Sequence, residues 1–205
     1  MTRTRLNSAA RREVIVAAAR SVFLDDGYSG ARTKLIAERS GITEAILYRH
    51  FASKEELFEA SVVAPLSDLL DDLLDRSRTI MATDDPVELR IHRLEQAWIE
   101  LSMQIVPLLG VALFSDQQHG QRRYRELVMP FLASMLEATS GSGLIPPEAP
   151  GTSGAVIVNA AFGMNLMLAV DQLASSKEPD VAGLAGQITD LFFLGLSEAR
   201  SLGLR

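Results

Sequence analysis

The stretch TKLIAERSGITEAILYRHF, residues 33–51, decides the fold of the N-terminal part of this chain. Two short apolar rows are separated by a single glycine, Gly41, and the second row ends in the polar and aromatic run Tyr48–His50. The small Ala37 lies in the middle of the first row, where a second helix can cross closely, and glycine at position 41 permits a positive φ. This order predicts two helices joined by a short turn at about 90–120°.

The two rows also predict which side chains face inward. Ile36, Ile42 and Leu47 have the spacing to seal the corner between the helices, and Phe51 continues the inward row of Leu47. The second helix would then present its N-terminal part to the major groove of DNA, as a recognition helix does. The residues left on the outside or at the edge are Thr43, Glu44, Ala45, Ile46, Tyr48, Arg49 and His50.

Apolar residues recur at three- and four-residue steps along the whole chain, which predicts an all-α fold of about nine helices. A helix over about 8–25 ends at Gly27, and Ser53 opens a capping box that begins a long helix over 54–78, kinked at Pro65. We expect a three-helix helix-turn-helix domain over 1–52 and a larger helical domain over 53–205. The other predicted segments are 86–105, 107–114, 121–139 with a kink at Pro130, 153–175 and 180–202.

Charge is distributed unevenly between these two parts. Residues 1–54 hold ten basic and five acidic residues, a net charge of +5, so the remainder of a chain with net charge −6 carries −11. A basic head on an acidic body suits approach to a polyanion, although chance clustering is the alternative. The chain has no cysteine, which excludes disulfides and fits a cytoplasmic protein. We expect no apolar run long enough to span a membrane.

Residues 10–58 resemble the DNA-binding domain of the tetracycline-repressor (TetR) family of bacterial transcription regulators. The resemblance rests on AAARSVFLDDGY at 17–28 and on TKLIAERSGITEAILYRHFASKEELF at 33–58, with the aromatic end LYRHF of the recognition helix followed by SKEEL. The remainder resembles the family only in its layout of helices. The resemblance implies DNA contacts by Arg32, Thr33, Lys34, Thr43, Ala45, Ile46, Tyr48, Arg49, His50 and Lys54.

Those contacts would be of two kinds. Hydroxyls and cations such as Thr33, Tyr48 and Lys54 would hold phosphates, while Lys34 would reach a base edge and Ile46 would lie deep in the groove. Arginines of the N-terminal extension would follow the backbone or enter a minor groove. These are Arg3, Arg5, Arg11 and Arg12.

Plainer roles are the alternatives. Tyr48 and Phe51 could be packing aromatics, His50 a surface histidine and Lys54 a solvated charge. Arg49 departs from the family pattern, which often has a second aromatic there, and it could read guanine, contact phosphate or pair with Glu44. Ile46 also departs from the small or hydroxylated residue that is common at its position.

The larger part contains candidates for a ligand pocket and for a pairing surface. Methionine and aromatic side chains form adaptable apolar walls, with plain core packing as the alternative, so we expect an apolar small-molecule effector. The pocket candidates are Trp98, Met103, Phe114, Met129, Phe131, Phe162 and Asn165.

The last two helices are too apolar for a free surface, so they would pair in a homodimer or be buried within one chain. The pairing candidates are Met164, Met167, Leu191, Phe192 and Leu194.

The sequence therefore predicts a ligand-responsive, homodimeric regulator, most readily a repressor released from a double-stranded DNA operator by its effector. A Ser–His–Asp order, a metal triad, a glycine-rich phosphate loop and a cofactor fingerprint are all missing, so we expect no enzyme, no cofactor and no metal. The alternative is a helical small-molecule-binding protein without a DNA role.

Overall fold

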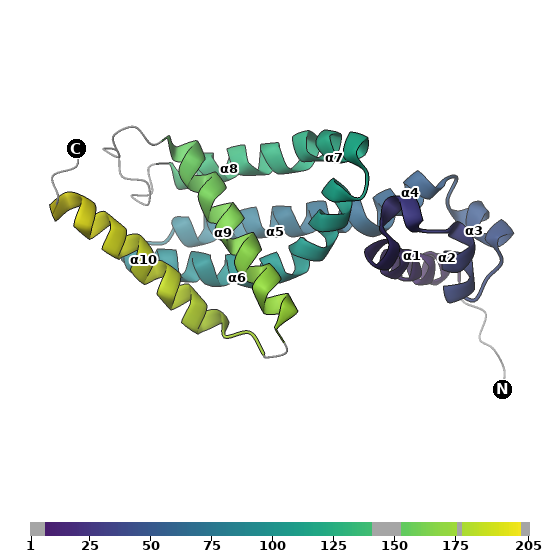
Figure 1. Cartoon of the computed structure of the whole chain (residues 1–205), viewed down its shortest axis with the longest axis horizontal. Helices are drawn as coiled ribbons and strands as arrows, with labels where there is room; N and C mark the ends of the chain where they lie inside the picture. Colours follow the sequence, from purple (N-terminus) through teal and green to yellow (C-terminus); the bar gives the residue numbers. More distant parts are fainter. Residues whose placement is uncertain (1–6, 141–152, 176–177, 202–205) are drawn as a thin grey trace. The chain divides into compact units, whose positions relative to one another are not determined.

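The computed structural model describes residues 7–140, 153–175 and 178–201, and within them the chain is helical without a strand (Figure 1). The predicted all-α class is confirmed. The elements are α1 (Ser8–Gly30), α2 (Thr33–Arg39), α3 (Glu44–His50), α4 (Lys54–Phe58), the π-helical turn η1 (Glu59–Val63), α5 (Ala64–Met81), α6 (Val87–Phe114), α7 (Gln117–Arg123), the π-helical turn η2 (Tyr124–Val128), α8 (Met129–Thr139), α9 (Gly154–Ala174) and α10 (Val181–Ser201).

The chain divides into two compact units. The first holds the residues up to Asp68 together with Pro107–Tyr124, and the second holds Leu69–Val106 and the residues from Arg125 onward. The boundary expected after residue 52 lies inside the first unit, where α4 and η1 both contact α1. Two phenylalanines bind these helices together, since the rings of Phe23 and Phe58 meet edge to face with centroids 4.9 Å apart.

Two glycines in the first unit have a positive φ. Gly41 has φ 66° in the turn between α2 and α3, as its place in the sequence predicts. Gly27 has φ 68° and ψ 175°, and its carbonyl accepts a hydrogen bond of 3.1 Å from the amide of Ala31. The predicted break at Gly27 is therefore present, although helical turns resume and α1 continues to Gly30.

Replacing Gly27 with alanine should lower the free energy of unfolding by about 2–3 kcal/mol, because its combination of φ and ψ is almost confined to glycine. The added Cβ would also lie 3.3 Å from the Cβ of Ser115. Gly41→Ala serves as the matched control, with an expected loss of about 1 kcal/mol for a left-handed residue. Urea unfolding measures the free energy of unfolding of both variants. An equal loss in the two would contradict the prediction that Gly27→Ala is the more destabilising.

A π-helical turn, η1, lies just before Pro65. Proline has no N–H, so the carbonyl of Ser61, four residues earlier, loses its normal helical donor. The Nε of Arg20 in α1 donates to that carbonyl at 2.9 Å, and the π-helical turn η1 ends just before the proline. The side chain of Arg20 therefore replaces the missing backbone donor.

The break expected at Pro107 is wrong, because α6 runs through it from Val87 to Phe114. The lost backbone hydrogen bond is outweighed by burial of the following turns, where Leu108, Leu109 and Ala112 are all buried. Pro107 is also the residue at which the chain passes from the second unit to the first.

Two described helices, α6 and α9, are long and apolar enough to cross a membrane by length and composition. The expectation that no segment qualifies is therefore wrong. Half of the apolar window of α6 is buried within the structure, against 22% of the window of α9. A buried core helix passes the same composition test, so these two helices are weak evidence for a membrane span.

Candidate functional site

The angle between α2 and α3 is fixed by buried apolar side chains. Ile36, Ala37, Leu47 and Phe51 are all buried, and α2 contacts both α1 and α3. Thr43 caps α3 by accepting a 3.4 Å hydrogen bond from the amide of Ile46. The helix is therefore held at both its start and its inner face, which leaves its outer face available.

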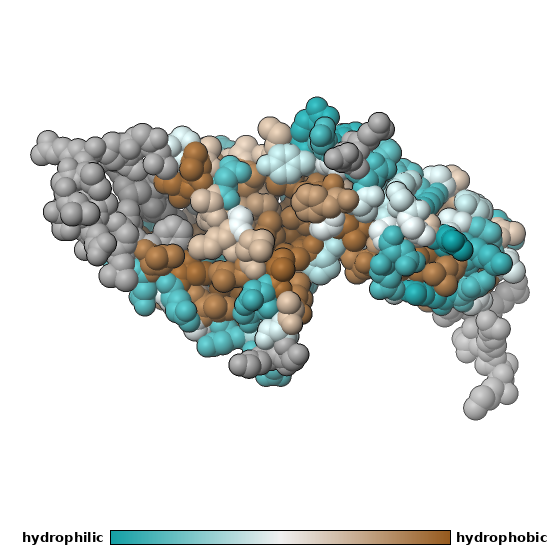
Figure 2. Space-filling view, in the orientation of Figure 1, coloured by the Kyte–Doolittle hydropathy of each residue, from teal (hydrophilic) through white to brown (hydrophobic). Residues whose placement is uncertain are grey.

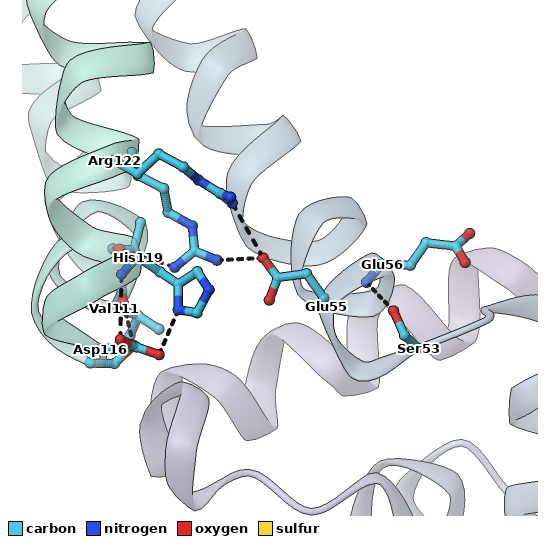
Figure 3. Close-up of polar contacts among 10 residues, drawn as sticks. Ser53, Glu55, Glu56, Val111, Asp116, His119 and Arg122 are labelled. Atoms are coloured by element: carbon cyan, nitrogen blue, oxygen red, sulfur yellow. Dashed lines mark hydrogen bonds and ion pairs between the residues drawn. The ribbon is translucent and has the colours of Figure 1, made fainter.

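The start of α4 is capped from both sides. The Oγ of Ser53 accepts a 3.1 Å hydrogen bond from the amide of Glu56 (Figure 3). A carboxylate oxygen of Glu56 accepts a 2.6 Å bond from the amide of Ala52. The predicted capping box is confirmed, with the difference that its carboxylate reaches the amide before the cap. This fixes where Lys54 begins its helix.

The residues expected to contact DNA lie in α2 and α3 or directly before them, except Lys54, which begins α4. Thr33, His50 and Lys54 are half-buried, and the others are exposed. Ile46 and Tyr48 are exposed although they are large and apolar or aromatic. The exposed members are Arg32, Lys34, Thr43, Ala45, Ile46, Tyr48 and Arg49.

Two hydroxyls of this face are joined to a carboxylate. The hydroxyl of Thr33 donates to a carboxylate oxygen of Glu44, and the hydroxyl of Tyr48 donates to the oxygen of Thr33 at 3.3 Å. The sequence reading considered Glu44 only as a partner of Arg49. Because Thr33 and Glu44 begin their respective helices, their closeness follows from the corner geometry rather than from sequence spacing.

The N-terminal arginines differ in their surroundings. Arg12 lies 4.0 Å from the ring centroid of Phe51, donates to the carbonyl of His50 at 2.9 Å, and lies 3.9 Å from the carboxylate of Glu56. It thus joins α1 to the end of α3 and to α4, while its side chain stays 45% exposed. Arg11 is half-buried, and Arg3 and Arg5 lie outside the described residues.

The first unit also contains a buried arginine. Arg123 is 2% exposed, donates from Nη2 to the carboxylate of Glu55 at 2.9 Å, and places its guanidinium 4.4 Å from the ring centroid of Phe58. Burial and a hydrogen bond with Glu55 raise the pKa of Tyr28 to about 12. Sequence reasoning missed this group because Glu55 and Arg123 are distant along the chain.

Lys54 borders the same group. Its Nζ lies 4.8 Å from the ring centroid of Tyr28, and burial lowers the pKa of the ammonium. The cation is therefore placed at the first turn of α4 by an aromatic face.

In the second unit, the structure brings together some of the expected pocket residues. The rings of Trp98, Phe131 and Phe162 are buried and in mutual contact, with centroids 5.6–6.1 Å apart. Asn165 is fully buried one helical turn after Phe162, and Met103 is half-buried.

Two pocket candidates are not part of this cluster. Phe114 is 84% exposed and belongs to the first unit, and Met129 is 52% exposed. Their helical positions turn them toward the surface, which apolar character alone does not reveal. The grouping expected from the sequence is corrected at these two residues.

A buried carboxyl group lies beside the aromatic cluster, and the sequence reading missed it. Glu95 in α6 is buried and accepts a 3.0 Å hydrogen bond from the Nδ2 of Asn165 in α9. Burial raises the pKa of Glu95 to about 7, and the hydrogen bond from Asn165 only partly opposes this. Its one sequence signal is a charge at a helical position one turn before Trp98, within an apolar helix face.

The expected pairing residues fall into three groups. Met167 in α9 and Leu191 in α10 are 66% and 63% exposed. Met164 is half-buried and packs inside its own unit against Ile99 and Ile188, and its place on the pairing surface stays a prediction. The side chains of Phe192 and Leu194 lie outside the described residues.

The comparisons with known proteins address the first unit most directly. Residues 15–61 match the model of "Bacterial regulatory proteins, tetR family". An HTH-type transcriptional activator, FasR of Mycolicibacterium smegmatis, is 37% identical over 42% of this chain and 38% of its own length. The A-factor receptor protein of Streptomyces griseus is 29% identical over 87% of this chain and 59% of its own length.

A solved structure shares the fold beyond that region. The transcriptional regulator FadR from Bacillus subtilis, in complex with stearoyl-CoA, has a TM-score of 0.63 at 14% identity, covering 88% of this chain and 96% of that one. The chain spans only about two fifths and three fifths of the length of these two curated relatives. By the match over residues 15–61, the helix-turn-helix region of this chain belongs to the tetR family of bacterial regulatory proteins, and the rest of the chain shares an all-helical fold with solved structures.

Proposed function

We propose that this chain is a DNA-binding transcription regulator of the cytoplasm that works as a homodimer. The observation that carries the proposal is the outer face of α2 and α3, where exposed cations and hydroxyls surround an apolar tip on a rigidly held recognition helix. Arg32, Lys34 and Arg49 supply exposed charge around Ile46 and Tyr48. Such a face suits phosphate contacts that position the helix and apolar contacts to base edges.

The dimer proposal is supported by an apolar stripe on α9. Val156, Ala160, Gly163, Met167 and Val170 are all exposed and follow each other at steps of four and three residues, which places them on one helix face. Figure 2 shows apolar side chains gathered over this helix. Small residues in the middle of the stripe permit close approach of a second copy.

We propose further that a small molecule bound among Trp98, Phe131 and Phe162 releases the regulator from DNA, as a repressor requires. The FadR structure from Bacillus subtilis supports a ligand role for this part of the fold, since that protein holds stearoyl-CoA. A ligand that favours one dimer arrangement would shift the population, and a shift from 1:99 to 99:1 needs about 5.5 kcal/mol of differential affinity. The relative FasR is named an activator, so a transcription assay is needed to decide between repression and activation.

Removing exposed cations from the outer face should weaken DNA binding and flatten its salt dependence. For Arg32→Ala and Lys34→Ala, we expect the slope of log K against log salt to fall by about one for each lost phosphate contact. A gel-shift series on the DNA upstream of the protein's own gene, over several salt concentrations, measures this. Arg78→Ala is the matched control, because Arg78 is exposed in α5 and paired with Asp75.

Unchanged slopes in both variants would contradict the assigned face. If the wild type also failed to bind that DNA at low salt, the alternative of a helical small-molecule-binding protein without a DNA role would be favoured. The basic outer face is the observation that favours the regulator over that alternative.

A charge placed in the α9 stripe should separate the dimer. For Met167→Glu, we expect a monomer at concentrations where the wild type is a dimer, because the buried carboxylate would lack a partner. Ala155→Glu is the control, since Ala155 is exposed on α9 but lies about 100° around the helix from Val156, off the stripe. Analytical ultracentrifugation gives the mass, and a wild-type monomer would overturn the dimer proposal.

A further inference from the structure

The second unit contains polar atoms that are buried without a hydrogen-bond partner. They are the Oδ1 of Asn165, the Nε1 of Trp98 and the Oγ of Ser102. All three side chains are nine-tenths or more buried. Leaving such atoms unpaired costs free energy, so in native proteins they commonly find a partner in an ordered water, an ion or a ligand.

These atoms share one location. Glu95, Trp98 and Ser102 follow at steps of three and four residues, so they lie along one face of α6. Asn165 reaches that face from α9, because its Nδ2 donates to the carboxylate of Glu95 at 3.0 Å and to the carbonyl of Ala161 at 3.1 Å. Both hydrogens of the amide are therefore used, and its oxygen is left as an acceptor.

The chemistry of the group selects its ligand. The carboxylate of Glu95 and the oxygen of Asn165 both accept hydrogen bonds, so their missing partner is a donor; the indole N–H of Trp98 is itself a donor, and this partner does not satisfy it. The rings of Trp98, Phe131 and Phe162 meet edge to face or tilted beside them, and aromatic faces attract cations. A neutral donor would satisfy the oxygen of Asn165 but would leave the buried carboxylate without a counter-charge.

We propose that this interior group, Glu95, Trp98, Phe131, Phe162 and Asn165, binds a lipophilic ammonium compound, whose charged nitrogen donates to Glu95 and Asn165 while its apolar body parts the three rings. The inference deepens the proposed function, on which it rests for the effector role. It replaces the wholly apolar effector expected from the sequence by an amphiphilic cation.

The single tryptophan of the chain makes the site directly observable. Trp98 is that residue, so its fluorescence reports on the proposed site alone. The intact protein is titrated with phenethylamine, phenethyl alcohol and phenylacetate, which share an aryl group and differ in charge. A charge-assisted hydrogen bond in a buried site predicts that the amine binds about 10- to 100-fold more tightly than the alcohol, and phenylacetate least of all.

Substitution of the carboxyl group completes the test. Glu95→Gln should bind the amine and the alcohol about equally, while Glu100→Gln, whose carboxylate is exposed on the same helix, should keep the wild-type preference. Circular dichroism confirms that each variant is folded. Equal affinity for amine and alcohol in the wild type, an unchanged emission of Trp98 with the amine, or a preference that survives in Glu95→Gln would overturn the proposal.

A separate readout distinguishes failure of this site from failure of the proposed function. DNA binding is measured with and without the amine at saturation. Amine binding by a protein that binds no DNA would leave the site standing and overturn the regulator. Amine binding that leaves DNA affinity unchanged would overturn only the effector role.

Discussion

Glu95→Gln is expected to stabilise the protein by about 3 kcal/mol near pH 8 and by less than about 0.5 kcal/mol near pH 4.5. The carboxyl group is buried in the second unit, and burial raises its pKa from 4.5 to about 7. Glutamine keeps the shape and can still accept the hydrogen bond from Asn165, but it never carries a charge. The substitution therefore removes only the cost of ionising the buried group.

The sign of this effect follows from proton binding. Because the pKa in the folded state lies above that in the unfolded chain, the folded protein holds the proton more tightly between the two values. Stability from Glu95 is fully present below about pH 4.5, is lost as pH rises toward 7, and stays lost above it. The glutamine variant lacks this loss, so the two stability curves should separate across that window.

Urea unfolding at a series of pH values measures both proteins, and their difference cancels the other titrating groups. Glu100→Gln provides the control, since that carboxylate is exposed and its removal should change stability little at any pH. A difference between wild type and Glu95→Gln that is constant with pH would contradict burial of an ionisable group there. A less stable variant at pH 8 would do so as well.

A destabilising carboxyl group in a core is informative about function. Glutamine or an apolar residue at position 95 would fill the same space and give a more stable protein. The presence of glutamate there is therefore not explained by stability. Sequences commonly depart from the most stable choice at functional positions. This agrees with the proposed role of Glu95 as the counter-charge for an ammonium ligand.

The sequence predicts the first unit well because its signals are local. The glycine at position 41, the caps Thr43 and Ser53, and the inward pair Leu47 and Phe51 each depend on residues within one or two turns. Propensities and caps operate over that range, so they can be read from a single chain. Once the inward residues of α2 and α3 are known, the remaining residues of the two helices can be assigned to their outer face.

The pairing of side chains across helices could not be read in the same way. The contacts of Thr33 with Glu44, of Glu55 with Arg123 and of Glu95 with Asn165 join residues 11, 68 and 70 positions apart. Nothing in the sequence fixes which helices meet, or at what rotation. For the same reason, apolar character placed Phe114 and Met129 in a pocket that their helical orientation excludes.

Glu55→Ala is expected to lower the free energy of unfolding by about 3 kcal/mol, and a second substitution, Arg123→Met, should restore about 1–2 kcal/mol of that loss. Arg123 is 2% exposed and its guanidinium has the carboxylate of Glu55 at 2.9 Å. Without Glu55, the buried guanidinium of Arg123 has no counter-charge. The free energy lost in this way is larger than the net stabilisation that the intact ion pair provides. Methionine fills a similar volume without charge, so it removes the cost.

The expected stability changes of the single variants are the reference for the double variant. Arg123→Met alone should cost about 1–2 kcal/mol, because the contact with the ring of Phe58 is lost while Glu55 remains partly exposed to water. Arg122→Met is the matched control: its Nη2 lies 3.8 Å from the same carboxylate oxygen, but its side chain is 52% exposed. A surface pair of that kind contributes about 0–1 kcal/mol.

Urea unfolding of the four variants and the wild type forms a double-mutant cycle with the exposed arginine as its reference. The buried charge predicts that the double variant is more stable than Glu55→Ala, whereas an ordinary surface salt bridge predicts that it is less stable. The sign alone therefore decides whether Arg123 is held as a buried cation. Because Glu55 is in the first turn of α4 beside Lys54, DNA binding of Glu55→Ala should weaken in parallel with stability, and Arg123→Met should restore both together.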